Sequence, residues 1–203
     1  MQRRTLLRHA AAAATAAGVT FTAGSVSAAD NPKRVLIVIY SRRGEEYAPG
    51  GAELLDVGHT ERMARVIAKV TGGELLRIDT VKAYPVNYRE MTEVAQEELN
   101  ANARPELSTP IPDMSKYDTV FIGHPIWWSE MPMAMRTFLD KVDLSGKKVA
   151  HFTTHAGSGL GSSDRTLRRV VKGAEFLEPL AITGRQVDAS EARITSWVKS
   201  LGF

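Results

Sequence analysis

The stretch that decides the fold is Thr119-Val120-Phe121-Ile122-Gly123-His124-Pro125-Ile126-Trp127-Trp128-Ser129-Glu130-Met131-Pro132. Its apolar start, residues 119–123, predicts a buried strand that is broken at Pro125, because proline cannot donate a hydrogen bond to a strand ladder. A helix is expected to begin near Pro132, since proline is well tolerated in a first helical turn. The two adjacent tryptophans, of three in the whole chain, then lie in the loop between strand and helix. An open α/β sheet binds its ligand in such a loop at the carboxyl end of a parallel strand, and aromatic rings there favour a flat, stacking ligand.

The residues on both sides of this stretch alternate between strand and helix patterns. Residues 34–40 are predicted to form a strand, because the run from Val35 to Tyr40 is continuously apolar, as expected for a strand that is covered on both faces. Apolar residues at helical spacing, followed by a Gly-Gly stop, predict a helix over residues 60–71. The expected strands are 34–40, 74–79, 119–123, 147–153 and 175–182, the last interrupted at Pro179. The expected helices are 60–71, 87–100, 132–142, 162–171 and 190–201, and residues 43–58 and 100–117 are expected to be irregular.

Strands that alternate with helices indicate parallel βαβ units. The sequence therefore predicts one α/β domain, residues 33–203, in which a doubly wound five-stranded parallel sheet lies between two helix layers. Right-handed crossovers place the loops after the first, third and fourth strands along one edge of that sheet. A binding site is expected at this edge.

Composition limits the classes of function. The chain has 203 residues, of which 43% are apolar and 24% are charged, as is usual for a soluble globular domain. It contains no cysteine, which excludes disulfides, thiolate metal sites and cysteine nucleophiles. Three of the 26 basic residues and none of the 23 acidic ones lie in the first 28 residues, so the remaining 23 basic residues balance the acidic ones. This neutral balance does not support nucleic-acid binding, and no metal site is expected.

The first 28 residues have the layout of a secretory signal. The pair Arg3-Arg4 precedes a moderately apolar, alanine-rich run over residues 10–23, and small residues follow at the expected cleavage site after Ala28 or Ala29. The arginine pair indicates export by the twin-arginine route to a periplasmic or other extracytoplasmic location. The apolar run is short and weakly apolar, so no stable membrane span is expected after the signal is removed. The alternative is a disordered or amphipathic tail with a chance arginine pair.

The loop after the first strand offers groups that suit a phosphate. These are Ser41, Arg42, Gly58, His59 and Thr60. Backbone N–H groups at a helix N-terminus bind phosphate, and Arg42 would add positive charge. Alternatively, Thr60 only caps the helix and Ser41 only ends the strand. The loop does not match the G-x-x-x-x-G-K-[ST] or G-x-G-x-x-G nucleotide patterns.

The two other loops also permit a binding and a structural interpretation. The loop Pro125-Ile126-Trp127-Trp128 offers an aromatic wall, or else packing, since tryptophan is usually largely buried. The loop Thr154-His155-Ala156-Gly157-Ser158-Gly159 lets backbone approach a ligand closely, or else forms a flexible turn with a lone histidine. Brought together at one sheet edge, the three loops supply a phosphate cradle, an aromatic wall and a thin backbone wall. That combination suits flavin mononucleotide (FMN).

On these residues the chain resembles the flavodoxin family, in particular a branch with a Tyr/His-Pro-Ile-Trp-Trp loop and a Thr-His-Gly/Ala-Gly-Ser-Gly loop. Asn102-Ala103-Arg104-Pro105 and Met131-Pro132 are also similar to that branch, and the resemblance runs from about Arg34 to Leu201. It implies a flavodoxin-like fold of strand order 2-1-3-4-5 with noncovalently bound FMN. By the same resemblance, Ser41, Gly58, His59 and Thr60 hold the phosphate, and residues 125–128 and 154–159 flank the isoalloxazine ring.

Three features depart from the family pattern. The phosphate loop is typically a short Ser-x-x-Gly-Asn-Thr segment, whereas here Arg43–Val57 is inserted before Gly58-His59-Thr60. His59 also stands where asparagine is usual. The insert is expected to form a flap beside the flavin. Family members that carry electrons are strongly acidic, whereas this mature chain is neutral.

The sequence predicts an exported flavodoxin-like protein that binds FMN and transfers electrons, with the flavin supplying the chemistry. No side chain needs to act as nucleophile or general base. His155 either stabilises negative charge on the reduced flavin or only orders its loop. The alternative is an NAD(P)H-dependent flavin or quinone reductase, which the neutral charge and the insert favour over an obligate protein-to-protein carrier. A non-redox binding protein on the same fold is a third possibility, and the sequence does not identify the small molecule or protein that would be the redox partner.

Overall fold

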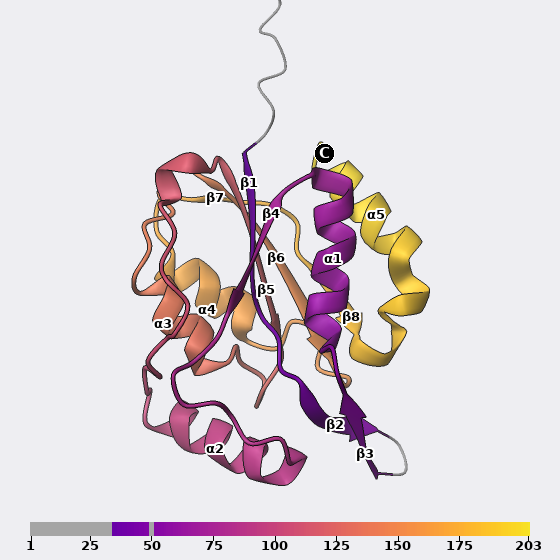
Figure 1. Ribbon diagram of the computed structural model, residues 1–203. Helices are drawn as coiled ribbons and strands as arrows, with labels where there is room; N and C mark the ends of the chain where they lie inside the picture. Colours follow the sequence, from indigo (N-terminus) through magenta and orange to yellow (C-terminus); the bar gives the residue numbers. More distant parts are fainter. Residues whose placement is uncertain (1–33, 49–50) are drawn as a thin grey trace, which may run out of the picture. The chain divides into compact units, whose positions relative to one another are not determined.

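The computed structural model describes residues 34–48 and 51–203, which group into one compact unit. The predicted signal segment, residues 1–28, lies outside the described residues. Within them, six strands form one sheet in the order β4-β1-β5-β6-β7, with β8 also paired to β6, and every pairing is parallel. The strands are β1 (Val35–Tyr40), β4 (Glu74–Ile78), β5 (Thr119–Pro125), β6 (Lys148–His155), β7 (Glu175–Phe176) and β8 (Leu180–Thr183) (Figure 1).

This order confirms the predicted 2-1-3-4-5 arrangement, with one correction to the number of strands. The fifth predicted strand is divided into β7 and β8, which lie on either side of Pro179. Both pieces pair with β6, through Lys148 opposite Glu175 and Phe152 opposite Leu180. Because proline cannot donate to the ladder, the described sheet has six strands rather than the predicted five.

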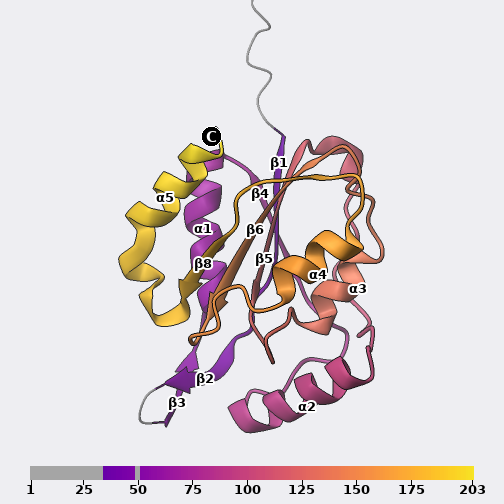
Figure 2. The ribbon, with the colours of Figure 1, turned by 180° about the vertical axis from the view of Figure 1, so that it is seen from behind.

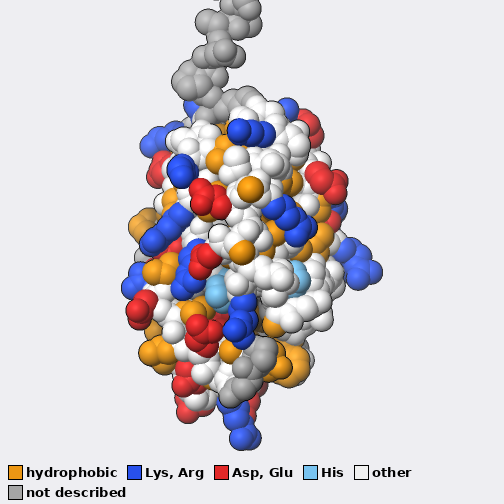
Figure 3. Space-filling model, turned by 90° about the vertical axis from the view of Figure 1, so that its right-hand side faces the viewer, with side chains coloured by type: hydrophobic (Ala, Val, Ile, Leu, Met, Phe, Trp, Pro, Cys, Tyr) orange, Lys and Arg blue, Asp and Glu red, His pale blue; other side chains and the backbone are white. Residues whose placement is uncertain are grey.

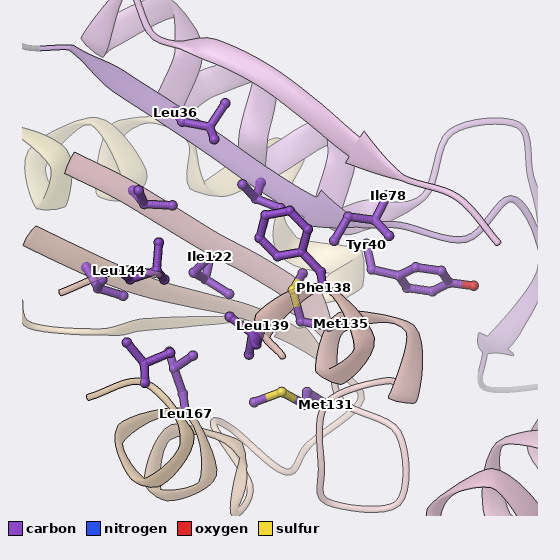
Figure 4. Close-up of a cluster of buried hydrophobic side chains, with 14 of the residues drawn as sticks. Leu36, Tyr40, Ile78, Ile122, Met131, Met135, Phe138, Leu139, Leu144 and Leu167 are labelled. Atoms are coloured by element: carbon purple, nitrogen blue, oxygen red, sulfur yellow. The ribbon is translucent and has the colours of Figure 1, made fainter. Parts of the chain in front are cut away.

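Helices cover both faces of the sheet, as the side-chain alternation of the strands requires. The helices α1 (His59–Thr71) and α5 (Glu191–Ser200) lie on one face, and α3 (Met133–Leu139) and α4 (Ser163–Val170) lie on the other (Figures 1 and 2). Successive strand residues point to opposite faces, so Ile37 and Ile39 of β1 join the cluster with α1 and α5. Leu36 and Tyr40 join the opposite cluster, whose side chains from β1, β5, α3 and α4 meet in Figure 4. Helix α3 runs from Met133 to Leu139 and is therefore shorter than the predicted 132–142.

The insert after β1 is a β-hairpin, which corrects the expectation of an irregular segment over residues 43–58. Strands β2 (Gly44–Ala48) and β3 (Gly51–Leu55) pair antiparallel, with Glu46 opposite Glu53. The turn between them lies outside the described residues. The hairpin stands beyond the carboxyl end of β1, next to the start of α1 (Figure 1). The segment 101–117 is largely irregular, as predicted, apart from a short 3-10 turn over Met114–Lys116.

Helix α2 (Tyr88–Asn100) lies across the carboxyl edge of the sheet rather than on a sheet face (Figures 1 and 2). It begins at Asn87, whose side chain accepts a hydrogen bond from the Glu90 N–H at 3.1 Å. Only Met91 and Ala95 of this helix are buried, and α2 contacts β2 and α3. The two segments that depart most from a plain doubly wound fold, the hairpin and α2, therefore both lie at the ligand-binding edge. Among the residues that the structure describes, none of the helices has the length and apolar character needed to cross a membrane.

Candidate functional site

A cavity of about 470 Å³ opens at the carboxyl edge of the sheet. This volume lies within the range of small-molecule sites. Nine of the lining residues come from the three predicted loops: Arg42, His59, Pro125, Ile126, Trp127, Trp128, Thr154, His155 and Ala156. The remaining lining residues come from the hairpin, from α2 and from the segment after β8: Glu46, Tyr47, Tyr88, Met91, Thr92, Ala95, Thr183, Gly184 and Arg185. The sheet edge thus brings the three loops together as expected, and two covering segments complete the wall.

The hydroxyls of the first loop are used within the protein. The Ser41 hydroxyl accepts a hydrogen bond from the Glu61 N–H at 3.1 Å, so it caps α1 from a distance. The Thr60 and Thr154 hydroxyl oxygens are 2.7 Å apart, and this buried bond ties the first loop to the third. A Cβ atom on Gly58 would lie 2.3 Å from the Arg42 carbonyl oxygen, so only glycine fits there. Among the described residues, the cavity lining does not include Ser41, Gly58 or Thr60.

Arg42 reaches the cavity, but its terminal nitrogens are bound to backbone carbonyls. The side chain is buried, and it donates to the carbonyl oxygens of Glu45 and, at 2.8 Å, Val86. These bonds join the base of the hairpin to the segment that leads into α2. Arg42 therefore has a structural role, and its role as a source of positive charge for a phosphate stays a prediction.

The two tryptophans occupy different environments. The Trp127 ring meets Tyr40 and Tyr84 edge to face, with centroid separations of 5.3 and 5.2 Å, and packs against the buried cluster of Figure 4. Trp128 is 53% exposed, and its indole N–H donates to the Thr92 carbonyl of α2 at 2.9 Å. The packing explanation thus accounts for much of Trp127, whereas Trp128 presents an open aromatic surface at the cavity. Its φ of 50° is in the left-handed region, which costs a non-glycine residue roughly 1–2 kcal/mol.

The third loop contributes its first three residues to the cavity. Thr154, His155 and Ala156 line it, whereas Gly157, Ser158 and Gly159 lie outside the lining formed by the described residues. The His155 Nδ1 atom accepts a hydrogen bond from the Gly157 N–H at 2.9 Å, which orders the loop. Burial lowers the pKa of His155, so the ring is neutral near pH 7. Gly157 and Gly159 have φ values of 150° and 61°, which side-chain-bearing residues rarely adopt.

A carboxylate and an imidazole face each other at the α1 end of the cavity. Glu46 Oε2 lies 3.9 Å from His59 Nε2. Burial lowers the pKa of His59 and raises the pKa of Glu46, so desolvation opposes the charge on both groups. The Nδ1 atom of His59 is buried and has no hydrogen-bond partner among the described residues. The first residue of α1 therefore lines the cavity and carries a buried polar atom that has no partner among the described residues.

Sequence reasoning missed the covering residues for identifiable reasons. The segment Pro49-Gly50-Gly51 between two Glu-rich runs is a turn signal, and it marks the hairpin that carries Glu46 and Tyr47. Met91 and Ala95 are spaced as two residues on one helix face. They indicate that α2 buries a narrow stripe, but the sequence does not show what that stripe covers. The segment that carries Arg185 offers no comparable signal.

Two histidines behind the aromatic loop form a buried hydrogen-bonded chain. His124 Nδ1 lies 2.9 Å from the Pro125 carbonyl oxygen, the two Nε2 atoms of His124 and His151 are 2.9 Å apart, and His151 Nδ1 lies 3.1 Å from Asp164 Oδ1. A carbonyl and a carboxylate only accept, so both Nδ1 atoms carry a hydrogen. The Nε2 contact joins the two rings, so one hydrogen-bonded chain runs from Asp164 to the Pro125 carbonyl oxygen.

The pKa is shifted at two positions of this chain, His124 and Asp164. The hydrogen bond from His151 lowers the pKa of Asp164 to about 2, so its carboxylate is ionised. Complete burial, followed by the charge of His151, lowers the pKa of His124 to about 3. His124 is therefore neutral, and its Nδ1 donates a hydrogen bond to the Pro125 carbonyl oxygen at the cavity wall.

Comparison with known proteins places the chain among flavin-binding folds. A sequence model described as Flavodoxin matches residues 52–201. A candidate flavoprotein from Bacteroides uniformis is 24% identical, covering 82% of this chain and 98% of that one, with a TM-score of 0.65. Another from Bacteroides eggerthii is 25% identical over 79% and 97% of the two chains, with a TM-score of 0.59. A flavoprotein in complex with FMN from Lactobacillus acidophilus is 23% identical over 77% and 97%, also with a TM-score of 0.59.

The His124 environment predicts acid lability. Because the folded-state pKa of about 3 lies below the ordinary 6.5, the unfolded chain takes up a proton first and stability falls with pH between these values. Through the titration of His124, the free energy of unfolding, measured by urea denaturation, should drop by about 3 kcal/mol between pH 7 and pH 4.

The His124→Asn variant should be less stable than the wild type at pH 7 but should lose less stability on acidification. His155→Asn is the control, since its ring is only partly buried. Equal pH slopes for the wild type and His124→Asn would contradict the assignment.

Proposed function

The chain belongs to the flavodoxin family, and from that premise we propose that its cavity binds FMN noncovalently. The observation that carries the proposal is the convergence of three separate loops on one cavity at the carboxyl ends of β1, β5 and β6. The residues present also fit the cofactor. The apolar and aromatic wall suits the ring. The N-cap of α1 is Gly58, which has no side chain to cap the helix, so the first N–H groups that Ser41 does not bind suit the phosphate.

Each part of the cavity then has a role in holding the cofactor. The start of α1, where His59 lines the cavity, would hold the phosphate. Ile126, Trp128 and Met91 would hold the isoalloxazine ring between the second loop and α2. The backbone of the third loop, from Thr154 to Ala156, would border the ring edge. The bound flavin supplies electron transfer, and the protein orients it and excludes water.

We propose that the protein transfers electrons, with a small-molecule reductase activity as the second candidate. Two observations support this second candidate over an obligate protein-to-protein carrier. The first is that the hairpin and α2 cover the cavity, which suits a small acceptor better than a docked protein. The face shown in Figure 3 also carries acidic and basic side chains interspersed, rather than an acidic docking patch. Such mixed charge gives little steering toward a protein partner.

The first prediction of this proposal is that the purified protein takes up FMN. The protein should show flavin absorption, and denaturation should release the flavin intact, since no covalent link is expected. A colourless protein that takes up no added FMN would exclude both redox functions and favour a non-redox binding protein. NAD(P)H oxidation with quinones as acceptors separates the other two functions, because turnover supports the reductase and a flavin-loaded protein without turnover is a carrier.

The two tryptophans should respond differently to substitution. Trp127→Ala removes a ring that packs on the core and should lower the free energy of unfolding by about 3 kcal/mol. Trp128→Ala should change stability by less than about 1 kcal/mol but weaken FMN binding about tenfold, because it removes stacking surface. Trp128→Phe is the matched control, which keeps a ring without the N–H. Urea denaturation and flavin-fluorescence titration measure the two effects, and unchanged FMN affinity in Trp128→Ala would show that the ring binds elsewhere.

Export by the twin-arginine route is a further part of the proposal, and it is supported by the sequence of residues 1–28. The double variant Arg3→Lys, Arg4→Lys should retain the protein in the cytoplasm of a host with this route, whereas Arg8→Lys should not. Cell fractionation followed by N-terminal sequencing should find the exported chain beginning at Ala29 or Asp30. Unchanged export of the double variant would contradict the assignment.

A further inference from the structure

Glu46 lies beside the first residue of α1, the helix whose start would hold the phosphate of the proposed cofactor. It belongs to β2 of the inserted hairpin, lines the cavity, and approaches His59 Nε2 to 3.9 Å. His59 is the first residue of α1 and follows the N-cap residue Gly58. A carboxylate of the chain itself therefore already lies against the side chain of the first residue of this helix.

The cations around Glu46 are bound to other groups. Arg42 and Arg62 favour its ionised form, but Arg42 donates to backbone carbonyls. Arg62 donates to the Val57 carbonyl at 3.1 Å and pairs with Asp188 at 3.0 Å. Within residues 34–48 and 51–203, His59 is the ion-pair partner of Glu46. The other charged groups that act on His59 are Arg62, Asp188, Glu53 and Arg185.

A phosphate at the start of α1 would thus meet a carboxylate that no arginine neutralises directly. Like charges a few ångströms apart repel strongly where water is partly excluded, and the Glu46 side chain is only 30% exposed. Riboflavin differs from FMN in lacking the phosphate, so it would present a neutral hydroxyl at this position. Only the phosphorylated flavin would be penalised.

We propose that Glu46 is a selectivity residue of the cavity: its carboxylate opposes the phosphate of FMN at the N-terminus of α1 and does not oppose riboflavin. The inference rests on the proposed flavin-binding function. A consequence is that FMN binds more tightly as pH falls and Glu46 loses its charge. Burial raises the pKa of Glu46, so this change begins above the ordinary range of a glutamate. Protonation of His59 and of the phosphate itself acts in the same direction, but these groups are left intact when Glu46 is replaced.

The test compares two flavins on three proteins. Dissociation constants for FMN and riboflavin are measured by flavin-fluorescence titration of the apoprotein, for the wild type, Glu46→Gln and Glu53→Gln. Glu53 lies directly opposite Glu46 in the hairpin and is exposed, so its variant makes the same charge change away from the cavity lining. Glu46→Gln should tighten FMN at least tenfold at pH 8 and leave riboflavin within about twofold, since a unit charge at this range exceeds a factor of ten. Glu53→Gln should change either affinity by less than about threefold.

Other outcomes are equally clear. If Glu46→Gln tightens both flavins equally, or neither, the carboxylate does not act on the phosphate and the inference is overturned. Glu46→Ala removes the same charge but leaves a smaller side chain, so its dissociation constants for FMN and riboflavin should agree with those of Glu46→Gln. If they disagree, the effect comes from packing of the hairpin and not from the charge. The pH dependence of FMN binding should be shallower in Glu46→Gln than in the wild type. A wild-type protein that bound neither flavin would overturn the proposed function itself, which is a different failure.

Discussion

Parallel pairing of three largely buried strands is the constraint on which the rest of the structure depends. All of β1 is buried, and β5 and β6 continue the same layer. Buried backbone N–H and C=O groups must be paired, so the ladder fixes the register between neighbouring strands. Gly123 permits this pairing at one point, because a Cβ atom there would lie 2.1 Å from the Phe152 ring on β6. Since the strands run in one direction, the three loops leave the sheet at one edge.

The covering segments are joined to that edge by polar contacts rather than by apolar burial. The Glu45 carboxylate accepts hydrogen bonds from the Asn87 side chain at 2.9 Å and from the Tyr88 N–H at 2.8 Å, at the start of α2. Negative charge at a helix N-terminus is stabilising. Arg42, two residues after the end of β1, bonds both the hairpin and Val86. The hairpin and α2 are thereby held to each other and to the sheet, and both line the cavity.

The sequence predicted the sheet better than it predicted the hairpin and α2, and the reason is physical. Buried strands such as β1 must be continuously apolar, and this pattern is visible locally in the sequence. The hairpin is exposed and rich in glutamate, and α2 buries only Met91 and Ala95, so neither carries a strong apolar pattern. Their positions follow from Arg42, Glu45 and Val86, whose contacts span more than forty residues. The histidine pair was missed likewise, because His124 and His151 meet only once β5 and β6 are aligned.

The loop over residues 125–130 is held by hydrogen bonds to the body of the protein. These bonds explain how two of its residues can adopt an unfavourable backbone conformation. Trp128 and Ser129 both have positive φ, and such residues persist where surrounding contacts over-determine them. Here the contacts are the paired backbone bonds between Trp127 and Glu130, each 2.9 Å, and the Ser162 N–H and hydroxyl, which both donate to the Ser129 carbonyl. Glu130 accepts from the hydroxyls of Ser162 and Thr166 on the α4 side. His124 fixes the Pro125 carbonyl at the other end of the loop. Because these bonds lie on the protein side, the exposed face of Trp128 is oriented before any ligand arrives, and a ligand that stacks there does not have to order the loop.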